Sequence, residues 1–600
     1  ISKRGDHNLA VLARLKPNVS LQQAQSEMTS VAKALEQEHP ESNAFYTVTV
    51  LPLREQIVGD IRPSLLVLMA AVALVLLIAC SNVANMLLAR ATGRQREIAI
   101  RTALGASRSR IIRQLLTEAI LLSLLGGAVG ILLNLVGIKL LLALLPESVL
   151  RIDEIPTDAA VLGFTLVLSF LTGAFFGLAP SLKITKVDTN EMLKEGGSKG
   201  STGGFRRNRT RSILVISEVA FSLMLLIGAG LLIKSYMSLL YVNPGLNPEN
   251  VLTARVPLAQ TKYAESYQKK AFFTRALQEL KASPGVVAVG ATSHVPLSGQ
   301  EASRGFSIEG KQVSSPQETP LGDNRTIDAE YFRVMEIPLL KGRLFTAADN
   351  ESAPGVVIIN DSMARRFFSG EDPLGKRLKM GGPTSTRPWL TVIGVVGDVR
   401  HTGLKAEVRP SMYVPYAQSI EPDMTLVVRT ASDPMAAAAT VRRIIWSIDK
   451  DQPLTDIKTM EQYFSDSVAL QRFNMLLLGV FAIVALILAA LGVYGVMSYS
   501  VSQRTREIGI RMALGAQAKD VLKLILKQGM FLAVLGVAIG LTAAFILTRV
   551  MQSLLFDVAT NDVVIFIGAA LVLILVMLIA SYVPARRAIR IEPTIALRDD

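Results

Sequence analysis

The feature that most constrains this chain is a series of seven apolar stretches, each about as long as a bilayer is thick. They cover residues 64–88, 115–141, 159–179, 212–233, 474–499, 524–547 and 562–583. About 20 apolar residues, each adding about 1.5 Å to a helix, are needed to cross the hydrocarbon core. Hydrophobic residues make up 50% of the chain and charged residues 19%, below the share of about a quarter that soluble domains carry. The sequence therefore predicts a polytopic α-helical membrane protein.

The basic residues are concentrated in short segments beside these stretches, which indicates the orientation of the chain. Segment 90–113 holds seven basic residues and one acidic residue, and segment 183–211 holds eight basic residues. The turn after Pro146 instead carries four acidic residues and one arginine. Because short cytoplasmic loops are enriched in lysine and arginine, we expect the basic segments inside, and residues 1–60 and about 236–472 outside. This distribution accounts for the net charge of +14, so we expect no nucleic-acid partner.

A second constraint is an internal repeat. Residues 96–106 read REIAIRTALGA and residues 506–516 read REIGIRMALGA, which gives nine identities in eleven positions at an offset of 410 residues. Each copy lies between two apolar stretches, and later positions also correspond, as Pro180 does to Pro584, Asp188 to Glu592 and Leu193 to Leu597. Residues 9–14 similarly resemble residues 426–429. We therefore expect two tandem pseudo-symmetric halves, the first truncated at its N-terminus, within an intact protein of eight spans and two outer domains.

Residues 236–472 mix strand and helix patterns and are expected to form an α+β domain. Strand patterns cover 251–256, 286–292, 356–359 and 390–399, whereas helical patterns cover 263–282 and 435–449. In the opening segment, Ser20 and Gln23 have capping-box spacing, which predicts that a helix begins there.

Two patterns in the outer domain could suggest a catalytic or metal site. The segment 370–376 has the spacing of a phosphate-binding loop, but Arg377 stands where Ser or Thr must ligate Mg²⁺, so we expect a turn. The four histidines are far apart and Cys80 is the single cysteine, so we expect neither a metal site nor a disulfide. His401 is expected to be a hydrogen-bonded surface residue.

Three polar residues lie inside the apolar stretches. Glu218 is about seven residues into its stretch, where an ionisable side chain is costly unless it is paired or faces water. One interpretation is substrate or proton coupling; the favoured one is a salt bridge or hydrogen bond to a basic residue near the cytoplasmic interface. For Asn82 and Asn85, one helical turn apart, we favour hydrogen bonds between helices over ion coordination.

The repeated motif itself has the pattern of a short amphipathic helix, with Ile98 and Ile100 among charged residues and an apolar Leu-Gly-Ala end. Such a helix, rich in arginine, suits docking into a groove on a cytoplasmic partner. A positive-inside anchor would explain the arginines but not the repeated Leu-Gly-Ala, so we favour docking.

The motif, the order of spans and the outer domain together resemble the MacB/FtsX-like ABC transporter permease family. The resemblance is strongest to its duplicated single-chain form, of the acidobacterial orphan permease type. Outer-domain segments that carry it are Tyr331–Met335, Val356–Leu378 and Val392–Leu404. It implies a MacB-like periplasmic core domain, and coupling helices at about 96–106 and 506–516 that a cytoplasmic ABC ATPase grips. The coupling residues implied are Arg96, Glu97, Ile100, Arg101, Leu104 and Gly105, with Arg506, Glu507, Ile510, Arg511, Leu514 and Gly515 in the second copy.

The resemblance also implies partners and a location. This sequence contains no recognisable nucleotide-binding domain, so no cofactor is expected on the chain, and ATP and Mg²⁺ would bind a separate, dimeric ATPase. The chain would be a multi-pass protein of the bacterial inner membrane in contact with lipids, and an efflux role would add a periplasmic adaptor. We expect an export or mechanotransmission permease for small molecules or peptides. The alternative is a regulator of an envelope hydrolase or a lipoprotein-release permease, and a membrane-anchored enzyme is less favoured.

The expected domain organisation follows from the repeat and the resemblance. It comprises the C-terminal remnant of a first periplasmic core domain (1–62), a first FtsX-like three-span domain (63–195), a basic cytoplasmic linker (196–211), the opening span of the second half (212–235), a second MacB-like periplasmic core domain (236–472) and a second FtsX-like three-span domain (473–600).

Overall fold

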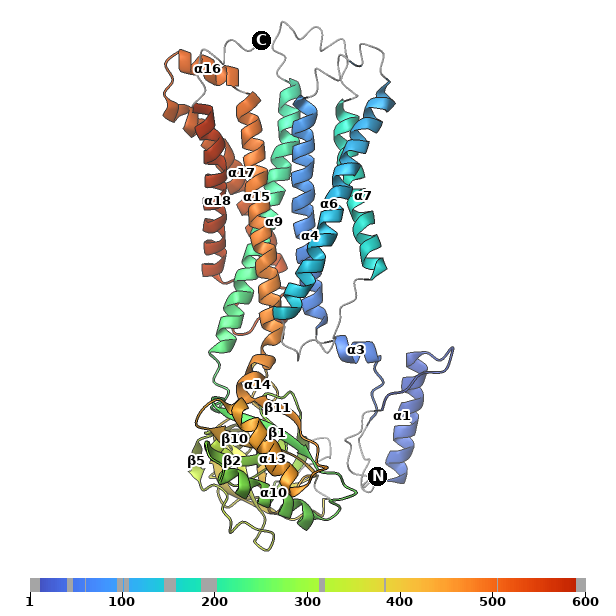
Figure 1. Cartoon of the computed structure of the whole chain (residues 1–600), viewed down its shortest axis with the longest axis vertical. Coiled ribbons are helices and arrows are strands. Elements are labelled where there is room, and N and C mark those ends of the chain that lie inside the picture. The colour runs from blue at the N-terminus through green and yellow to red at the C-terminus, as the bar shows by residue number, and fades with distance from the viewer. Residues whose placement is uncertain are drawn as a thin grey trace. The chain divides into compact units, whose positions relative to one another are not determined.

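The structure, a computed structural model, describes residues 11–39, 47–59, 61–93, 101, 107–144, 158–184, 202–311, 319–382, 385–503 and 505–589. The chain divides into two compact units. Residues 1–60 and 239–468 form one, here called the outer unit, and residues 61–238 and 469–600 form the other, the membrane unit. Figure 1 shows both units.

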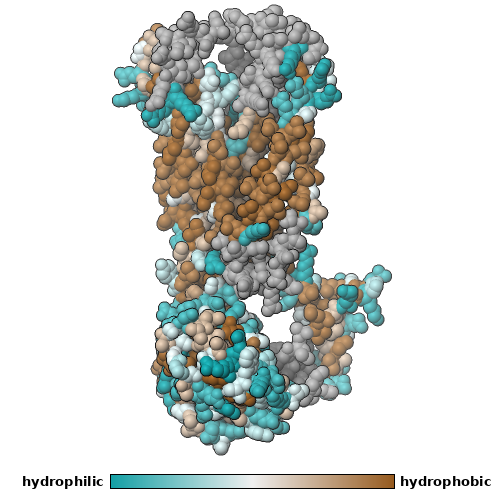
Figure 2. Space-filling view, viewed as in Figure 1, coloured by the Kyte–Doolittle hydropathy of each residue, from teal (hydrophilic) through white to brown (hydrophobic). Residues whose placement is uncertain are grey.

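A helix forms at every one of the seven predicted apolar stretches. These helices are α4 (Arg62–Gly93), α6 (Arg108–Leu144), α7 (Ala159–Ile184), α9 (Thr202–Leu240), α15 (Ala469–Gln503), α17 (Ala518–Leu547) and α18 (Val563–Ile589). Within the described residues six are long and apolar enough to cross a membrane, and the apolar part of α7 is the shorter segment Ala159–Ala174. Their outward side chains form an apolar belt with hydrophilic residues beyond it (Figure 2), as a lipid solvent requires.

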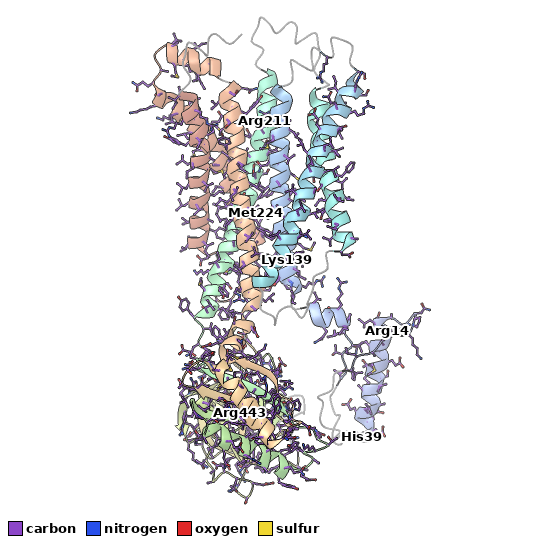
Figure 3. All side chains as sticks on the ribbon, in the orientation of Figure 1. Arg14, His39, Lys139, Arg211, Met224 and Arg443 are labelled. Carbon is purple, nitrogen blue, oxygen red and sulfur yellow. The ribbon has the colours of Figure 1, made fainter. Side chains whose placement is uncertain are left out.

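The core of the membrane unit is built around α9. Of the apolar segment of α9, 56% is buried, against 17% for α18 and 11% for α6. Neighbouring helices approach α9 closely at small residues: a Cβ atom added to Gly536 of α17 would lie 2.7 Å from the Val219 side chain. Small residues at helix contacts let backbones approach, which is the main source of helix association in a bilayer. The Arg211 side chain of α9, labelled in Figure 3, places its guanidinium 3.8 Å from the centroid of the Tyr499 ring of α15.

The two halves of the membrane unit meet along α4 and α15, which occupy equivalent places in the repeat. Asn474 of α15 donates a hydrogen bond to Ser64 of α4 at 2.9 Å, and both side chains are buried. These two residues are 410 residues apart, which is the offset of the repeated motif. When a residue contacts its own symmetry equivalent, the two-fold axis must pass through that contact. The internal pseudo-two-fold axis therefore runs between α4 and α15.

The outer unit is built on one mixed sheet of eleven strands. They are β1 (Val251–Pro257), β2 (Val286–Thr292), β3 (Ser303–Ile308), β4 (Leu321–Ile327), β5 (Leu339–Gly342), β6 (Val356–Asn360), β7 (Arg377–Met380), β8 (Leu390–Val396), β9 (Ser411–Pro415), β10 (Asp423–Thr430) and β11 (Thr455–Thr459). The order is β11-β1-β10-β2-β4-β3-β7-β8-β6-β9, with β5 paired to β8. Because β9 also pairs with β4, the strands from β4 to β9 in this order close into a ring.

Helices cover this sheet and separate its cores. They are α10 (Ser266–Lys281), α11 (Tyr331–Val334), α12 (Asp361–Phe367), the 3₁₀ turn η2 (Pro434–Ala437), α13 (Ala438–Ile448) and α14 (Met460–Ser467). One core lies between β1, β10, β2 and the pair α10 and α13, where Phe273 and Ile445 are fully buried. A second core surrounds α11, and a third fills the strand ring around Phe306. The six patterns predicted for this domain all correspond to elements of this fold.

The opening segment contains α1 (Leu21–Glu38) and α3 (Leu53–Val58). The capping box predicted at the start of α1 is present. The backbone N–H of Gln23 donates to Ser20 Oγ at 3.2 Å, and the backbone N–H of Ser20 donates to Gln23 Oε1 at 2.9 Å.

Candidate functional site: coupling helix, intramembrane junction and a buried polar cluster

The second copy of the repeated motif forms α16 (Thr505–Ala513), a short helix between α15 and α17. One of its faces packs inward through Ile508, which is 4% exposed. The other face carries Ile510 at 42% exposed and an ion pair between Glu507 and Arg511, whose atoms Oε1 and Nη2 lie 2.6 Å apart. The motif therefore divides into an anchoring face and a face that a partner could contact.

Leu514 projects from the end of α16, and its side chain is 82% exposed. The helix stops there because Gly515 adopts a φ of +99°, a left-handed conformation that glycine takes without strain. The Ala516 amide then donates back to the Arg511 carbonyl at 2.9 Å. Ile510 and Leu514, four residues apart, lie on one face and form an apolar pair beside Arg511.

The first copy of the motif lies mostly outside the described residues, including Arg96, Glu97, Ile100, Leu104 and Gly105. Arg101 is described, is exposed, and donates from Nη1 to Gln114 Oε1 at 3.1 Å. In the second copy, the side chain of Arg506 also lies outside what the structure describes.

Glu218 lies at the centre of an intramembrane polar junction formed by α4, α9 and α15. Its side chain is 1% exposed, and Oε1 accepts a hydrogen bond from the Asn82 amide of α4. That amide also donates to the Leu488 carbonyl of α15 at 2.9 Å, so Asn82 links all three helices. Within the described part of the chain Oε2 has no partner. The basic partner expected for Glu218 is thus corrected to an amide, because the buried carboxylate lies where α4 and α15 meet α9 and takes its hydrogen bond from Asn82.

Gly492 of α15 provides the space that Glu218 occupies. A Cβ atom at Gly492 would lie 2.2 Å from Glu218 Oε2, far inside van der Waals contact. Asn82 and Gly492 are the same position of the two halves, 410 residues apart. The first half thus contributes the Asn82 amide that donates a hydrogen bond to Glu218, whereas at the same position the second half has a glycine, whose missing side chain makes room for the carboxylate. The two halves therefore differ in chemistry at this pair of equivalent positions.

Two further hydrogen bonds link α9 to α15 of the second half and to α4 of the first half. Ser222 Oγ donates to the Ala485 carbonyl of α15 at 3.1 Å, and Ser81 Oγ of α4 donates to the Leu214 carbonyl at 3.2 Å. The hydrogen bond expected for Asn85 is not found: this residue is 7% exposed, and both its amide atoms lack a partner among the described residues.

The outer unit contains a second buried polar cluster that the sequence did not indicate. Arg325 of β4 is fully buried and donates from Nη2 to Asp323 Oδ2 at 3.1 Å, and the Asp323 side chain is also buried. Tyr413 lies beside Arg325 on the neighbouring strand β9. His401 Nε2 lies 3.0 Å from the Tyr413 hydroxyl, and His401 is only 5% exposed. The predicted surface position of His401 is therefore wrong, because the loop after β8 folds this side chain against the cluster.

Acid should destabilise the outer unit through two of its histidines, the half-buried His294 and the buried His401. Burial and the nearby charge of Arg325 lower the pKa of His294 from 6.5 to about 4, and the same causes lower the pKa of His401 well below 6.5. In the unfolded chain the two imidazoles bind protons near pH 6.5, whereas in the folded domain they stay neutral at that pH. The free energy of unfolding should therefore be highest above pH 6.5 and fall as the pH is lowered towards 4. Urea denaturation followed by tryptophan fluorescence at about pH 7.5 and 5.5 measures this fall.

The matched control for this pH effect is the double variant His294→Gln and His401→Gln. Its denaturation midpoint should depend less on pH over the same interval, because neither side chain can then take up a proton. An equal pH dependence in the variant and the parent would contradict the assignment.

The segment that resembles a phosphate-binding loop forms a turn, as predicted. Gly370 and Gly375 have φ values of +81° and +77°, and Lys376 pairs with Glu371 at 2.8 Å. Within the residues the structure describes, no group of three or more His, Cys, Asp or Glu side chains could hold a metal ion.

Comparison with known proteins agrees with this architecture. The FtsX-like permease C-terminal family matches residues 69–189 and again residues 479–593, and the MacB-like periplasmic core domain family matches residues 210–444. The macrolide export ATP-binding/permease protein MacB of Hahella chejuensis is 28% identical over 284 residues, which is 45% of this chain and 42% of that protein. The pyoverdine export ATP-binding/permease protein PvdT of Pseudomonas syringae pv. syringae is 26% identical over 291 residues, with shares of 46% and 42%. The matches thus span about two fifths of the length of these relatives.

Among solved structures, the periplasmic region of MacB from Actinobacillus actinomycetemcomitans matches with 18% identity and a TM-score of 0.26, covering 38% of this chain and 95% of that one. The permease family matches at two places, one in each half of the internal repeat, on either side of the outer domain. The chain therefore belongs to the MacB/FtsX-like ABC transporter permease family, in its duplicated single-chain form.

Proposed function

We propose that this chain is the permease of an ABC-type export system of the bacterial inner membrane, driven by a separate dimeric cytoplasmic ATPase. In this proposal the ATPase grips residues 96–106 and 506–516, and its motion reaches the outer unit through the transmembrane helices. The cargo is a small molecule or peptide handed to a periplasmic adaptor. ATP and Mg²⁺ bind the ATPase, and the chain itself performs no chemistry.

The observation that carries the proposal is the two-faced geometry of α16. Ile508 anchors the helix to the membrane unit, whereas Ile510, Arg511 and Leu514 are exposed on a segment that the charge distribution places in the cytoplasm. Arginine is enriched among the anchor residues of protein interfaces, and here Arg511 stands beside the exposed apolar side chains of Ile510 and Leu514. The helix therefore has the surface chemistry of a docking element.

A force applied at α16 has a direct route along the chain. Helix α15 is 35 residues long and begins after α14 with only Val468 between them. Helix α9, which precedes the outer unit in the sequence as α15 follows it, is joined to α15 by Ser222 and to α4 by Asn82. Continuous helices joined by buried polar contacts transmit displacement because packed cores do not deform gradually.

The pseudo-two-fold arrangement matches a dimeric ATPase. The repeat supplies two nearly identical docking motifs, and the axis between α4 and α15 relates the halves that carry them. A symmetric partner requires two equivalent contacts, which this single chain provides. The relatives are named for macrolide and pyoverdine export, which supports a small-molecule or peptide cargo.

Charge reversal at the two docking motifs should release the ATPase. We expect the Arg101→Glu and Arg511→Glu double variant to bind its ATPase at least about 30-fold more weakly, the loss typical of two interface anchor residues. The Leu514→Asp variant should weaken binding as well. Co-purification from detergent, followed by ATPase activity of the complex, measures both effects.

Lys523→Glu is the matched control, because it makes the same charge change at an exposed position of α17, close to α16 but outside the motif. It should leave the ATPase bound. Undiminished co-purification of the Arg101 and Arg511 double variant, or equal loss in the Lys523 control, would rule out specific docking at the repeated motif.

A further inference from the structure

Three lysines form a row on one side of the first part of α17. Lys519, Lys523 and Lys527 are spaced four residues apart, and all three are exposed. Residues four apart in a helix lie on the same side, one turn above another. The row, here called the lysine stripe, is therefore about 12 Å long at 1.5 Å per residue.

The acidic side chains nearest to the lysine stripe in the sequence already have partners. Residues 505–530 contain two of them, Glu507 and Asp520. Glu507 Oε1 lies 2.6 Å from Arg511 Nη2, and Asp520 accepts a hydrogen bond from the Gln517 backbone N–H at 3.2 Å. Within the described part of the chain, no ion pair involves the three lysines. Like charges one turn apart repel each other, so the stripe favours a negatively charged partner from outside the chain.

The lysine stripe continues directly into the apolar, outward side of α17. Phe531 and Val534 follow Lys527 by four and seven residues, which places all three side chains on one face, and both apolar side chains are exposed. Ala533, on the other side of the helix, is buried. Because α17 is long and apolar enough to cross a membrane, this exposed face meets lipid. The stripe therefore lies where the lipid-facing side of α17 reaches the membrane surface.

The other half of the repeat does not contain this row. The positions of α6 that match the three lysines at the offset of 410 residues are Ser109, Arg113 and Thr117. The preference for basic residues in cytoplasmic loops acts on both halves alike, so it does not explain a row of lysines on one face of one helix. The stripe is a property of α17.

We propose that the lysine stripe binds the phosphate groups of anionic phospholipids at the membrane surface. A phosphodiester supplies the negative charge that the stripe favours, and the acyl chains of the same lipid lie against Phe531 and Val534. A soluble phosphate ion could use only the first of these contacts. Lysine suits this role because its ammonium group is a point charge on a flexible stem that extends along apolar surface to reach the headgroups. The contact holds the start of α17, and with it α16, at the level of the headgroups.

Quenching by brominated lipids tests this proposal in the full chain. A fluorescent thiol label is attached at Leu524→Cys, an exposed position beside Lys523, in a chain that also carries Cys80→Ser. The protein is placed in phosphatidylcholine bilayers that contain brominated phosphatidylglycerol or, at the same fraction, brominated phosphatidylcholine. We expect the anionic lipid to be enriched at the label at least about fivefold over the neutral lipid, the factor that one lysine near an anionic surface contributes.

Salt distinguishes binding of charge from a preference for one acyl chain. The enrichment should fall when the salt concentration is raised from about 0.1 M to 1 M, because the screening length drops from about 10 Å to about 3 Å. Quenching by the neutral lipid should not change. An enrichment that does not respond to salt would overturn the proposal.

Replacing all three lysines of the stripe with glutamine should abolish the enrichment. The matched control replaces three exposed lysines of the outer unit, Lys281, Lys341 and Lys450, with glutamine, so the net charge changes equally while the stripe is kept. This control should retain the enrichment. Unchanged enrichment in the stripe variant, or equal loss in the control, would rule out the stripe as a lipid site. Loss of the co-purifying ATPase from the stripe variant, with unchanged lipid enrichment, would assign the stripe to a protein partner instead.

Discussion

Replacing Arg325 with alanine should lower the free energy of unfolding of the outer unit by about 3–5 kcal/mol, the cost typical of breaking a buried ion pair. Arg325 is 0% exposed and Asp323 is 1% exposed, so removal of the guanidinium leaves a carboxylate without a counter-charge in the protein interior. The loss of a large side chain beside Tyr413 adds a cavity. Both effects act on the centre of the sheet, so the whole outer unit should unfold at lower denaturant.

The chain provides a specific reporter for this measurement. Its two tryptophans, Trp389 and Trp446, both lie in the outer unit, so their fluorescence follows that unit in the intact protein. The matched control is Arg409→Ala, which breaks a surface pair with Glu301 at 2.9 Å and should cost at most about 1 kcal/mol. The double variant Arg325→Met and Asp323→Leu should recover most of the lost stability, because it removes both buried charges. A small effect of Arg325→Ala, comparable to that of the control, would show that the pair is not buried.

Adding one methyl group at Gly492 should destabilise the membrane unit by about 1–3 kcal/mol, the usual cost of overpacking. The new Cβ atom would lie 2.2 Å from Glu218 Oε2, so α9 or α15 must move. Because α9 is the most buried apolar helix described, its displacement disturbs contacts with α4, α15 and α17 together.

Cys80 reports on this unit in the same way that the tryptophans report on the outer unit. It is the single cysteine of the chain, is 7% exposed and lies in α4, so its reaction with a thiol-specific dye on heating follows opening of the membrane helices. Gly495→Ala is the control, since a Cβ atom there meets nothing within 4 Å among the described residues. Glu218→Ala should rescue Gly492→Ala by removing the clashing carboxylate, while Asn82 keeps its bond to the Leu488 carbonyl. Additive losses in the double variant would contradict a direct contact between the two positions.

The helices and strands that the sequence predicted are those whose hydropathy pattern matches the surroundings of the element in the fold. Apolar length alone located the seven apolar helices, six of which are long and apolar enough within the described residues to cross a membrane, because a lipid solvent leaves few alternatives to a hydrogen-bonded helix. The β-branched runs located β1, β2, β6 and β8. Strand β4 was missed because its sequence, LGDNRTI, is polar, and it is a strand because β3, β9 and β2 supply its hydrogen bonds.

The candidate sites also divide into those that a pattern along the chain indicates and those that depend on tertiary contacts. The repeated motif could be found by comparing the chain with itself, and its helical character in the second copy agrees with the periodicity of its residues. Glu218 and Asn82 could each be singled out as polar residues in apolar stretches, but not as partners, because 136 residues separate them. The Arg325 cluster had no signal, since charged residues are normally exposed.

By itself, the sequence therefore determined the apolar helices, the duplication and the family, because these depend on hydropathy and similarity along the chain. Only the tertiary structure decided which residues meet across the duplication. It joined Ser64 to Asn474 and placed the Glu218 carboxylate between Asn82 and Gly492. Such contacts depend on how helices far apart in the sequence pack, and packing is set by shape in three dimensions, which no local pattern records.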